Sequence, residues 1–236
     1  EALDLPDKIY TVRHVSLTDD QIKHYMSLKN AAIALLDDGD LVSAPAVMTQ
    51  LLRLQQVLCG HLMTDDGDLV EFKTRRIDAL LETIEEMSGG VIIWSRFRYD
   101  IRNIEAALKK AYGEDSTVNY YGDTSDSDRE LAIKRFQDRD ARFFVGNPQT
   151  AGKGLTLNAA SNVIYYANDF NLESRVQSED RCHRIGQKNT VTYVDFVSKG
   201  TVDEHIVKTL RAKIDLSAKT LGEEARQWLE LSPKKE

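Results

Sequence analysis

The amino-acid sequence predicts an α/β protein in which a parallel β-sheet is covered by helices on both faces and preceded by a helical leader. Two observations support this prediction. From residue 90 onward, short apolar runs typical of strands alternate with amphipathic segments of helical spacing. Before residue 90, the chain carries three apolar stripes with helical spacing. Strands that alternate with helices are typical of a parallel sheet that is buried on both faces.

The helical leader is predicted from the apolar stripes and the residues that bound them. A capping box at residues 18–21 (TDDQ) marks the start of the first helix. Pro45 suits the first turn of the second helix, which is followed by the turn-rich residues 64–68 (TDDGD). The third stripe ends at a glycine pair, residues 89–90. We therefore expect helices over residues 18–36, 45–58 and 77–87, and a mainly helical chain up to residue 90.

Strands and helices alternate in the rest of the chain. A second capping box at residues 201–204 (TVDE) opens a C-terminal helix that we expect to run towards Leu221. Asn171 is the expected cap of the helix before the last strand. The expected strands cover residues 91–94, 118–121, 143–145, 163–166 and 191–197, and the expected helices residues 100–111, 126–136 and 172–183.

The composition excludes some classes of protein. The chain has 31 Lys and Arg residues against 38 Asp and Glu residues, a net charge of −7, and 42% of its residues are hydrophobic. Disordered chains have fewer apolar residues, so we expect a folded core. No apolar run approaches the roughly 20 residues of a membrane-spanning helix. The acidic balance argues mildly against a nucleic-acid-binding protein, but the cations are clustered, and a local basic strip would be enough.

The cysteine content and the N-terminus bear on the origin of the chain. The two cysteines, Cys59 and Cys182, are too few for a metal cluster and are expected to be reduced thiols. A cytoplasmic or nuclear protein therefore fits better than a secreted one. The chain begins with Glu1 and has no signal-peptide pattern, so we expect it to be a piece of a longer protein.

Polar loops follow the predicted strands, and the working loops of a parallel sheet lie at the carboxyl ends of its strands. The loop between Gly146 and Gly154 is rich in glycine, which suggests a phosphate-binding P-loop. It departs from that motif in two ways. Five residues instead of four precede the Gly-Lys pair, and Gly154 stands where a Ser or Thr would bind Mg²⁺. The loop is therefore not predicted to bind ATP by itself.

The segment QSEDRCHRIGQ at residues 177–187 is more specific. On a helix, Gln177, Arg181 and Arg184 would lie within an arc of about 60° on one face. Two interpretations are open. The arginines form ion pairs with the acidic residues at 173, 179 and 180, or their guanidinium groups bind phosphate oxygens.

This segment resembles motif VI of the Swi/Snf-type ATPases of helicase superfamily two, Gln-Ala-x-x-Arg-x-x-Arg-Ile-Gly-Gln. Other segments resemble further motifs in the right order. VIIWSRF is similar to motif IV, YYGDTSDSDRELAIKRF to the block after it, and TAGKGLTLNAASNVIYYANDFN to motif V. GTVDEHIVKTL resembles the segment after the last strand, and LPDKIYTVRHVSLTDDQIKHY and LLRLQQVLCGH resemble the connection between the two lobes of the family.

The resemblance implies a RecA-like C-terminal helicase lobe of a DNA-dependent ATPase. ATP and Mg²⁺ would be held mainly by a first lobe that is absent from this chain. By resemblance, Arg184 is the arginine finger that reaches the γ-phosphate, and Arg181 lies beside it at the phosphates. Gln177, Gly152 and Gly154 are the expected nucleotide contacts, and no residue is expected to bind a metal.

The resemblance also implies that the lobe grips the backbone of double-stranded DNA. The expected partners are this DNA and the first lobe of the same parent chain, without a membrane and without oligomerisation. Hydroxyl, amide and cationic groups are suitable ligands for phosphates. The expected DNA contacts, each of which could instead have an ordinary role in a turn, are Ser95, Arg96, Gly122, Thr124, Asn147, Gln149 and Thr150.

The predicted domains are an inter-lobe leader at residues 1–89, the helicase lobe at residues 90–222 and a tail at residues 223–236. The predicted function is that of the second motor lobe of an ATP-dependent translocase on double-stranded DNA. A strand-separating helicase lobe and a non-catalytic interaction module with the same fold are the alternatives. A compact protein of this type would be cytoplasmic if encoded by a bacterium or phage, or else nuclear.

Overall fold

The computed structural model describes residues 5–37, 43–150, 155–212 and 233, which form two compact units. The first unit contains Ile77–Phe196 together with the N-terminal residues through Arg13. The second contains His14–Arg76 together with the residues from Val197 onward. In this described part of the chain, none of the helices combines the length and the apolar character that crossing a membrane requires. Cys59 and Cys182 are both buried and are not joined by a disulfide.

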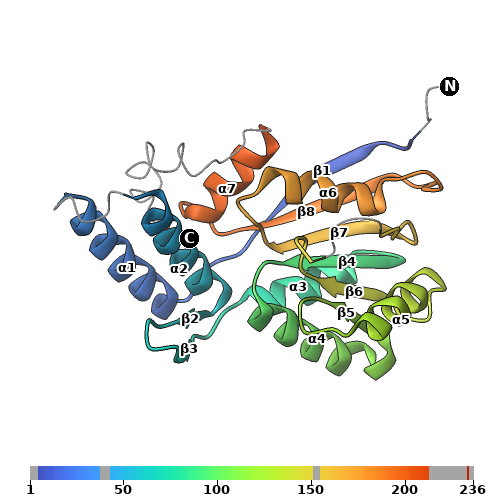
Figure 1. Cartoon of the computed structure of the whole chain (residues 1–236), viewed down its shortest axis with the longest axis horizontal. Helices are drawn as coiled ribbons and strands as arrows, with labels where there is room; N and C mark the ends of the chain where they lie inside the picture. Colours follow the sequence, from blue (N-terminus) through green and yellow to red (C-terminus); the bar gives the residue numbers. More distant parts are fainter. Residues whose placement is uncertain (1–4, 38–42, 151–154, 213–232, 234–236) are drawn as a thin grey trace. The chain divides into compact units, whose positions relative to one another are not determined.

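A six-stranded sheet organises the first unit (Figure 1). Its order is β1 (Lys8–His14), β8 (Val191–Val197), β7 (Ala160–Ala167), β4 (Gly90–Ser95), β6 (Phe143–Gly146) and β5 (Thr117–Tyr120). The pairings of β4, β5, β6, β7 and β8 are all parallel. The edge strand β1 runs in the same direction as β8, because Val191 N–H donates to the carbonyl of Asp7 and Val15 N–H to that of Val197. The predicted parallel sheet is confirmed.

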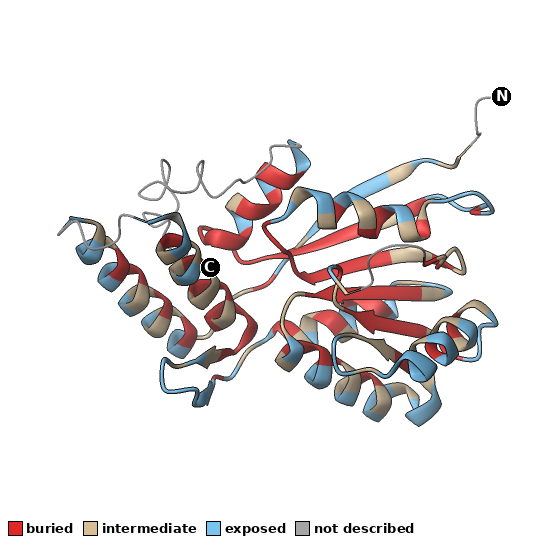
Figure 2. Ribbon diagram, in the orientation of Figure 1, coloured by how far each residue is buried: buried red, intermediate tan, exposed pale blue. Residues whose placement is uncertain are grey.

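Helices cover both faces of this sheet, as predicted. They are α3 (Arg76–Glu85), α4 (Arg98–Tyr112), α5 (Asp126–Gln137) and α6 (Leu172–Cys182). On one face, Trp94 and Phe144 form a buried cluster with Phe136 of α5 and Cys182 of α6. Because successive strand residues alternate between faces, Phe143 points the other way, where the ring of Tyr112 in α4 lies 5.0 Å from it. Strands β4, β6, β7 and β8 are accordingly buried along most of their length (Figure 2).

The second unit contains α1 (Asp19–Asp37), α2 (Ala44–Cys59), the hairpin of β2 (His61–Met63) and β3 (Leu69–Glu71), and α7 (Val202–Arg211). The first capping box is confirmed, because Gln21 N–H donates to Thr18 Oγ1 at 3.2 Å and Thr18 N–H to Gln21 Oε1 at 3.1 Å. A buried ion pair joins Arg76 to Asp203 at 2.8 Å.

Two details of the prediction were wrong. The leader is not purely helical, because it includes strand β1 and the β2–β3 hairpin around residues 64–68. Most residues of β1 are exposed at the sheet edge, so the strand lacks the apolar run that reveals a buried strand. The second capping box does not form, because Thr201 Oγ1 donates to the carbonyl of Ser198, and Glu204 accepts from Gly200 N–H. The expected continuation of the last helix to Leu221 lies outside the described residues, and the division into leader, lobe and tail stays a prediction.

Candidate functional site

The two arginines that the sequence singled out come together at one backbone carbonyl. Arg181 Nη1 donates to the carbonyl of Leu155 at 3.5 Å, and Arg184 Nη1 donates to the same oxygen at 3.4 Å. Arg184 Nη1 also lies 3.3 Å from Thr156 Oγ1. The side chain of Arg184 is exposed and that of Arg181 is half-buried. The site therefore presents the guanidinium group of Arg184 to solvent, with the half-buried Arg181 beside it.

Helix α6 positions these arginines, and it ends earlier than predicted. Asn171 caps it, as expected, by accepting a hydrogen bond from Ser174 N–H at 2.9 Å. The helix ends at Cys182, one residue before the predicted end at residue 183. Arg184 therefore follows the helix and does not continue its face, contrary to the prediction. Buried Gln187 organises the turn instead, because its Nε2 donates to the carbonyl of Ala160 at 2.7 Å and its N–H to that of Arg184 at 2.9 Å.

The acidic residues of α6 interact with groups other than Arg181 and Arg184. Glu173 accepts a hydrogen bond from Gln177 Nε2 at 2.8 Å, and Asp180 lies 3.8 Å from Lys8 Nζ. Arg181 Nε donates to the carbonyl of Gln177 at 3.0 Å. Within the described ranges, neither Arg181 nor Arg184 has a carboxylate at ion-pair distance. The ion-pair interpretation therefore does not account for this pair, and its positive charge remains available to an anion.

A buried charged network on the opposite face of α6 escaped the sequence analysis. Arg175 is 5% exposed, and its Nη1 lies 2.5 Å from Asp195 Oδ1 of β8, a residue with no exposed surface. Its Nε donates to Glu179 at 2.8 Å, and its guanidinium lies 3.6 Å from the centre of the Tyr165 ring. Burial disfavours the charged form of Arg175, but the combined interactions with Asp195, Tyr165 and Glu179 outweigh this effect, so the pKa of Arg175 is raised. An aspartate in the apolar strand VTYVDFV was the available signal.

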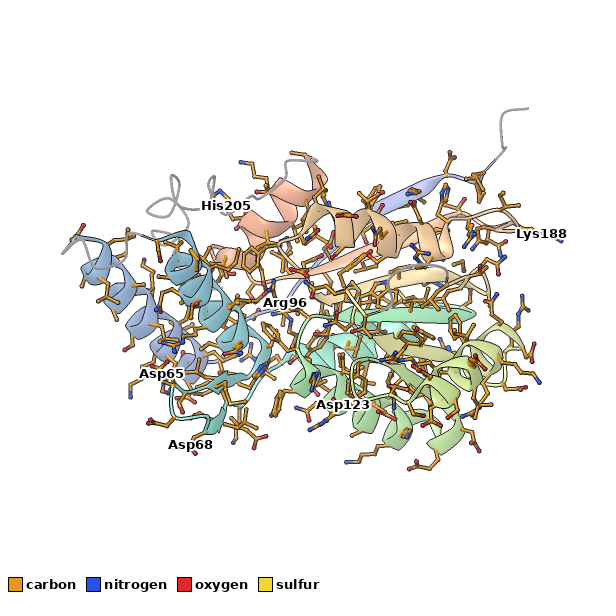
Figure 3. The ribbon with its side chains drawn as sticks, viewed as in Figure 1. Asp65, Asp68, Arg96, Asp123, Lys188 and His205 are labelled. Carbon is orange, nitrogen blue, oxygen red and sulfur yellow. The ribbon has the colours of Figure 1, made fainter. Side chains whose placement is uncertain are left out.

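Several predicted DNA contacts follow the carboxyl ends of β4 and β6, next to Asp169, which follows β7. Figure 3 labels Arg96 among them. Arg96 Nη1 lies 2.6 Å from Asp169 Oδ1, and its carbonyl accepts from Asn147 Nδ2 at 2.8 Å. Gln149 Nε2 donates to the other oxygen of Asp169, and Asn147 Oδ1 accepts from the N–H groups of Gln149 and Thr150. Burial lowers the pKa of Arg96, and Asp169 partly offsets this effect.

The remaining predicted contacts differ in their surroundings. Ser95 has no exposed surface, and its hydroxyl donates to Asp100 at 2.8 Å. Its side chain therefore makes an internal hydrogen bond and does not face solvent. Thr124 Oγ1 donates to Asn119 at 2.9 Å in the turn after β5, and Gly122 is exposed in the same turn. Gly152 and Gly154 lie outside the described residues.

The structure thus separates the predicted contacts into two regions. Asp169 and Arg96 lie beside the N-terminal end of α6, whereas Arg181 and Arg184 lie at its C-terminal end. At 1.5 Å per residue, the 11 residues of α6 separate these regions by about 16 Å. One helix therefore links a cluster of amides and one arginine to the pair of Arg181 and Arg184.

Comparisons with known proteins identify the family. The family model described as helicase conserved C-terminal domain matches residues 73–186. The ATP-dependent helicase fft3 of Schizosaccharomyces pombe is 32% identical over 64% of this chain, and Protein CHROMATIN REMODELING 4 of Arabidopsis thaliana is 27% identical over 90% of it. The chain spans only 16% and 10% of these two relatives.

A solved structure has a similar fold over almost all of this chain. The SWI2/SNF2 ATPase core of Sulfolobus solfataricus in complex with double-stranded DNA has a TM-score of 0.74 and 25% sequence identity. The match covers 97% of this chain and 51% of that one. The similarity therefore includes both the sheet and the segments that precede and follow it.

Proposed function

Because this chain belongs to the C-terminal helicase lobes of the Swi/Snf-type ATPases, we propose that it is the second motor lobe of an ATP-dependent translocase on double-stranded DNA. The observation that carries the proposal is the convergence of Arg181 and Arg184 on the carbonyl of Leu155, with the Arg184 side chain exposed. Guanidinium groups bind phosphate oxygens through paired N–H donors. Arg184 would place positive charge at the phosphoryl group where the transition state spreads negative charge.

The nucleotide would be shared with a first lobe of the same parent chain. That lobe would supply the phosphate loop and the Mg²⁺ ligands, and Mg²⁺ would neutralise charge on the phosphates. In this chain, Arg184 would orient the γ-phosphate, and Arg181 would support Arg184. Gln177 would be a polar contact that ties the helix carrying them to the nucleotide. We expect no ATP hydrolysis by this chain alone.

The cluster around Arg96 would contact the DNA backbone. Amide, hydroxyl and backbone groups lie at the carboxyl ends of neighbouring strands, and they belong to Asn147, Gln149, Thr150, Gly122 and Thr124. Such contacts position a protein on DNA without reading its sequence. The buried hydroxyl of Ser95 would act indirectly, through Asp100. The names of several relatives refer to chromatin remodelling, so we propose a nuclear location if the parent is eukaryotic and a cytoplasmic one if it is bacterial or phage-encoded.

The test is ATP hydrolysis by the full-length parent with duplex DNA, with single-stranded DNA and without DNA. We expect stimulation by duplex, and a decrease of about 10³-fold in kcat for Arg184→Ala with little change in the Kd for nucleotide. Lys188→Ala is the matched control, because Lys188 is an exposed cation four residues along the same loop and should leave kcat unchanged.

Three results would change the proposal. Stimulation mainly by single strands would favour a strand-separating helicase. Absence of DNA-dependent hydrolysis would favour the interaction module. Hydrolysis by the 236-residue chain alone that depends on Arg184 would contradict the expected need for a first lobe.

A further inference from the structure

Two exposed arginines outside the predicted contacts share one carboxylate at the carboxyl edge of the sheet. Arg98 and Arg102 lie one turn apart at the start of α4, and Asp123 lies in the turn after β5. Arg98 Nη1 is 2.8 Å from Asp123 Oδ1, and Arg102 Nη2 is 3.0 Å from Asp123 Oδ2. Figure 3 places Asp123 on the side of the sheet where Arg96 lies.

The two guanidinium groups retain capacity for a further anion. Their side chains are 64% and 63% exposed, and each guanidinium has five N–H donors, of which Asp123 takes one. A hydrogen bond to Tyr121 and another to Asp123 raise the pKa of Arg102. Two arginines and one aspartate leave a net charge of +1 in a chain whose overall charge is −7.

The adjacent glycine makes room for this arrangement. A Cβ at position 122 would lie 2.8 Å from Arg98 Nη2, so a side chain there would displace the guanidinium. Gly122 and Thr124 are proposed DNA contacts in the same turn. The arginines are therefore directly beside the proposed path of the DNA backbone.

We propose that Arg98 and Arg102, aligned by Asp123, contact two phosphates of the backbone of duplex DNA. This inference rests on the proposed function, because it adds residues to the DNA-binding surface. Guanidinium groups match phosphate geometry and stay charged at any physiological pH. The carboxylate holds both side chains in place before DNA arrives, which reduces the conformational entropy lost on binding.

The test is the salt dependence of duplex binding by the full-length parent. Each phosphate contact contributes about 0.9 to the slope of log K against log salt concentration. The double variant Arg98→Gln/Arg102→Gln should lower the slope by about 1.8 and weaken binding at 0.1 M salt by about 60-fold. Lys110→Ala is the matched control, because Lys110 is exposed on the same helix about 12 Å further from the carboxyl edge, and should leave the slope unchanged.

Two further measurements separate charge from folding. The double variant Arg98→Lys/Arg102→Lys keeps the charge and should retain most of the slope. Thermal unfolding midpoints equal to that of the parent would establish that the glutamine and lysine variants both fold. An unchanged slope in the glutamine variant, while the parent binds duplex, would overturn this inference and leave the proposed function standing. Failure of the parent to bind duplex would overturn both. If the parent binds an acidic peptide, and the glutamine variant loses this binding while it keeps duplex binding, the arginines would be assigned to a protein partner instead.

Discussion

Replacing Arg175 by methionine would leave the carboxylate of Asp195 buried without its cationic partner. Both residues are at most 5% exposed, and their charged atoms are 2.5 Å apart. Removing one member of a buried pair typically costs about 3–5 kcal/mol, because the remaining charge has lost both water and its partner. We therefore expect Arg175→Met to lower the free energy of unfolding by about 3–5 kcal/mol.

Urea unfolding of the 236-residue chain, followed by circular dichroism, measures this loss. With a slope of about 3 kcal/mol per M, the midpoint should fall by about 1–1.7 M. The double variant Arg175→Met/Asp195→Leu removes both charges and should recover most of the stability, because an apolar replacement of a buried pair is often neutral. Lys8→Met is the matched control. Lys8 pairs with Glu179 of the same network but is 26% exposed, so it should cost at most about 1 kcal/mol.

Two results would refute this reasoning. A loss below about 1 kcal/mol in Arg175→Met would mean that water or protonation of Asp195 compensates the lost partner. A double variant whose loss equals the sum of the two single losses would mean that the residues are not energetically coupled.

Two further predictions concern the second unit. Burial lowers the pKa of His61 to about 4, below its value of about 6.5 in the unfolded chain, so stability is full above pH 6.5 and falls by up to about 3 kcal/mol as the pH decreases towards 4. Urea unfolding between pH 7 and 4 should show a smaller decrease in His61→Leu, and parallel curves would contradict the assignment. Gly60 ends α2 at φ +91°, and a Cβ there would lie 2.7 Å from Thr74 Cγ2, so Gly60→Ala should cost about 2 kcal/mol or more. Thr74→Ser in the same background should recover part of this loss in thermal unfolding, and an unaltered midpoint in Gly60→Ala would show that the turn relaxes freely.

The sequence predicted the sheet because its central strands carry unbroken apolar runs. Residues 91–94 and 143–145 are entirely buried, and a strand buried on both faces needs such a run. Strand β1 was missed because its residues are mostly exposed at the sheet edge. The cap at Asn171 was predicted correctly from one residue. The cap at Thr201 was not, because its hydroxyl donates to the carbonyl of Ser198 and accepts no hydrogen bond from the first turn of α7.

The candidate site was less predictable because side-chain partners come from distant parts of the chain. Helical spacing placed Gln177, Arg181 and Arg184 on one face, but it could not reveal that both arginines would meet the carbonyl of Leu155. Spacing also gave no sign that Ser95 would be buried against Asp100. The sequence motifs predicted which positions belong to the site. The packing of the folded chain determines which of their side chains remain exposed.

Helix α6 is the element that would couple the two regions of the site. Its N-terminal end adjoins Asp169, which holds Arg96, and its C-terminal end carries Arg181. Between them, Arg175 and Glu179 tie the helix to β8 and β1 through Asp195 and Tyr10. A helix fixed to the sheet at its middle cannot slide along the sheet without breaking a buried ion pair, which costs several kcal/mol. We therefore expect the cluster around Arg96 and the arginine pair to move together as one body.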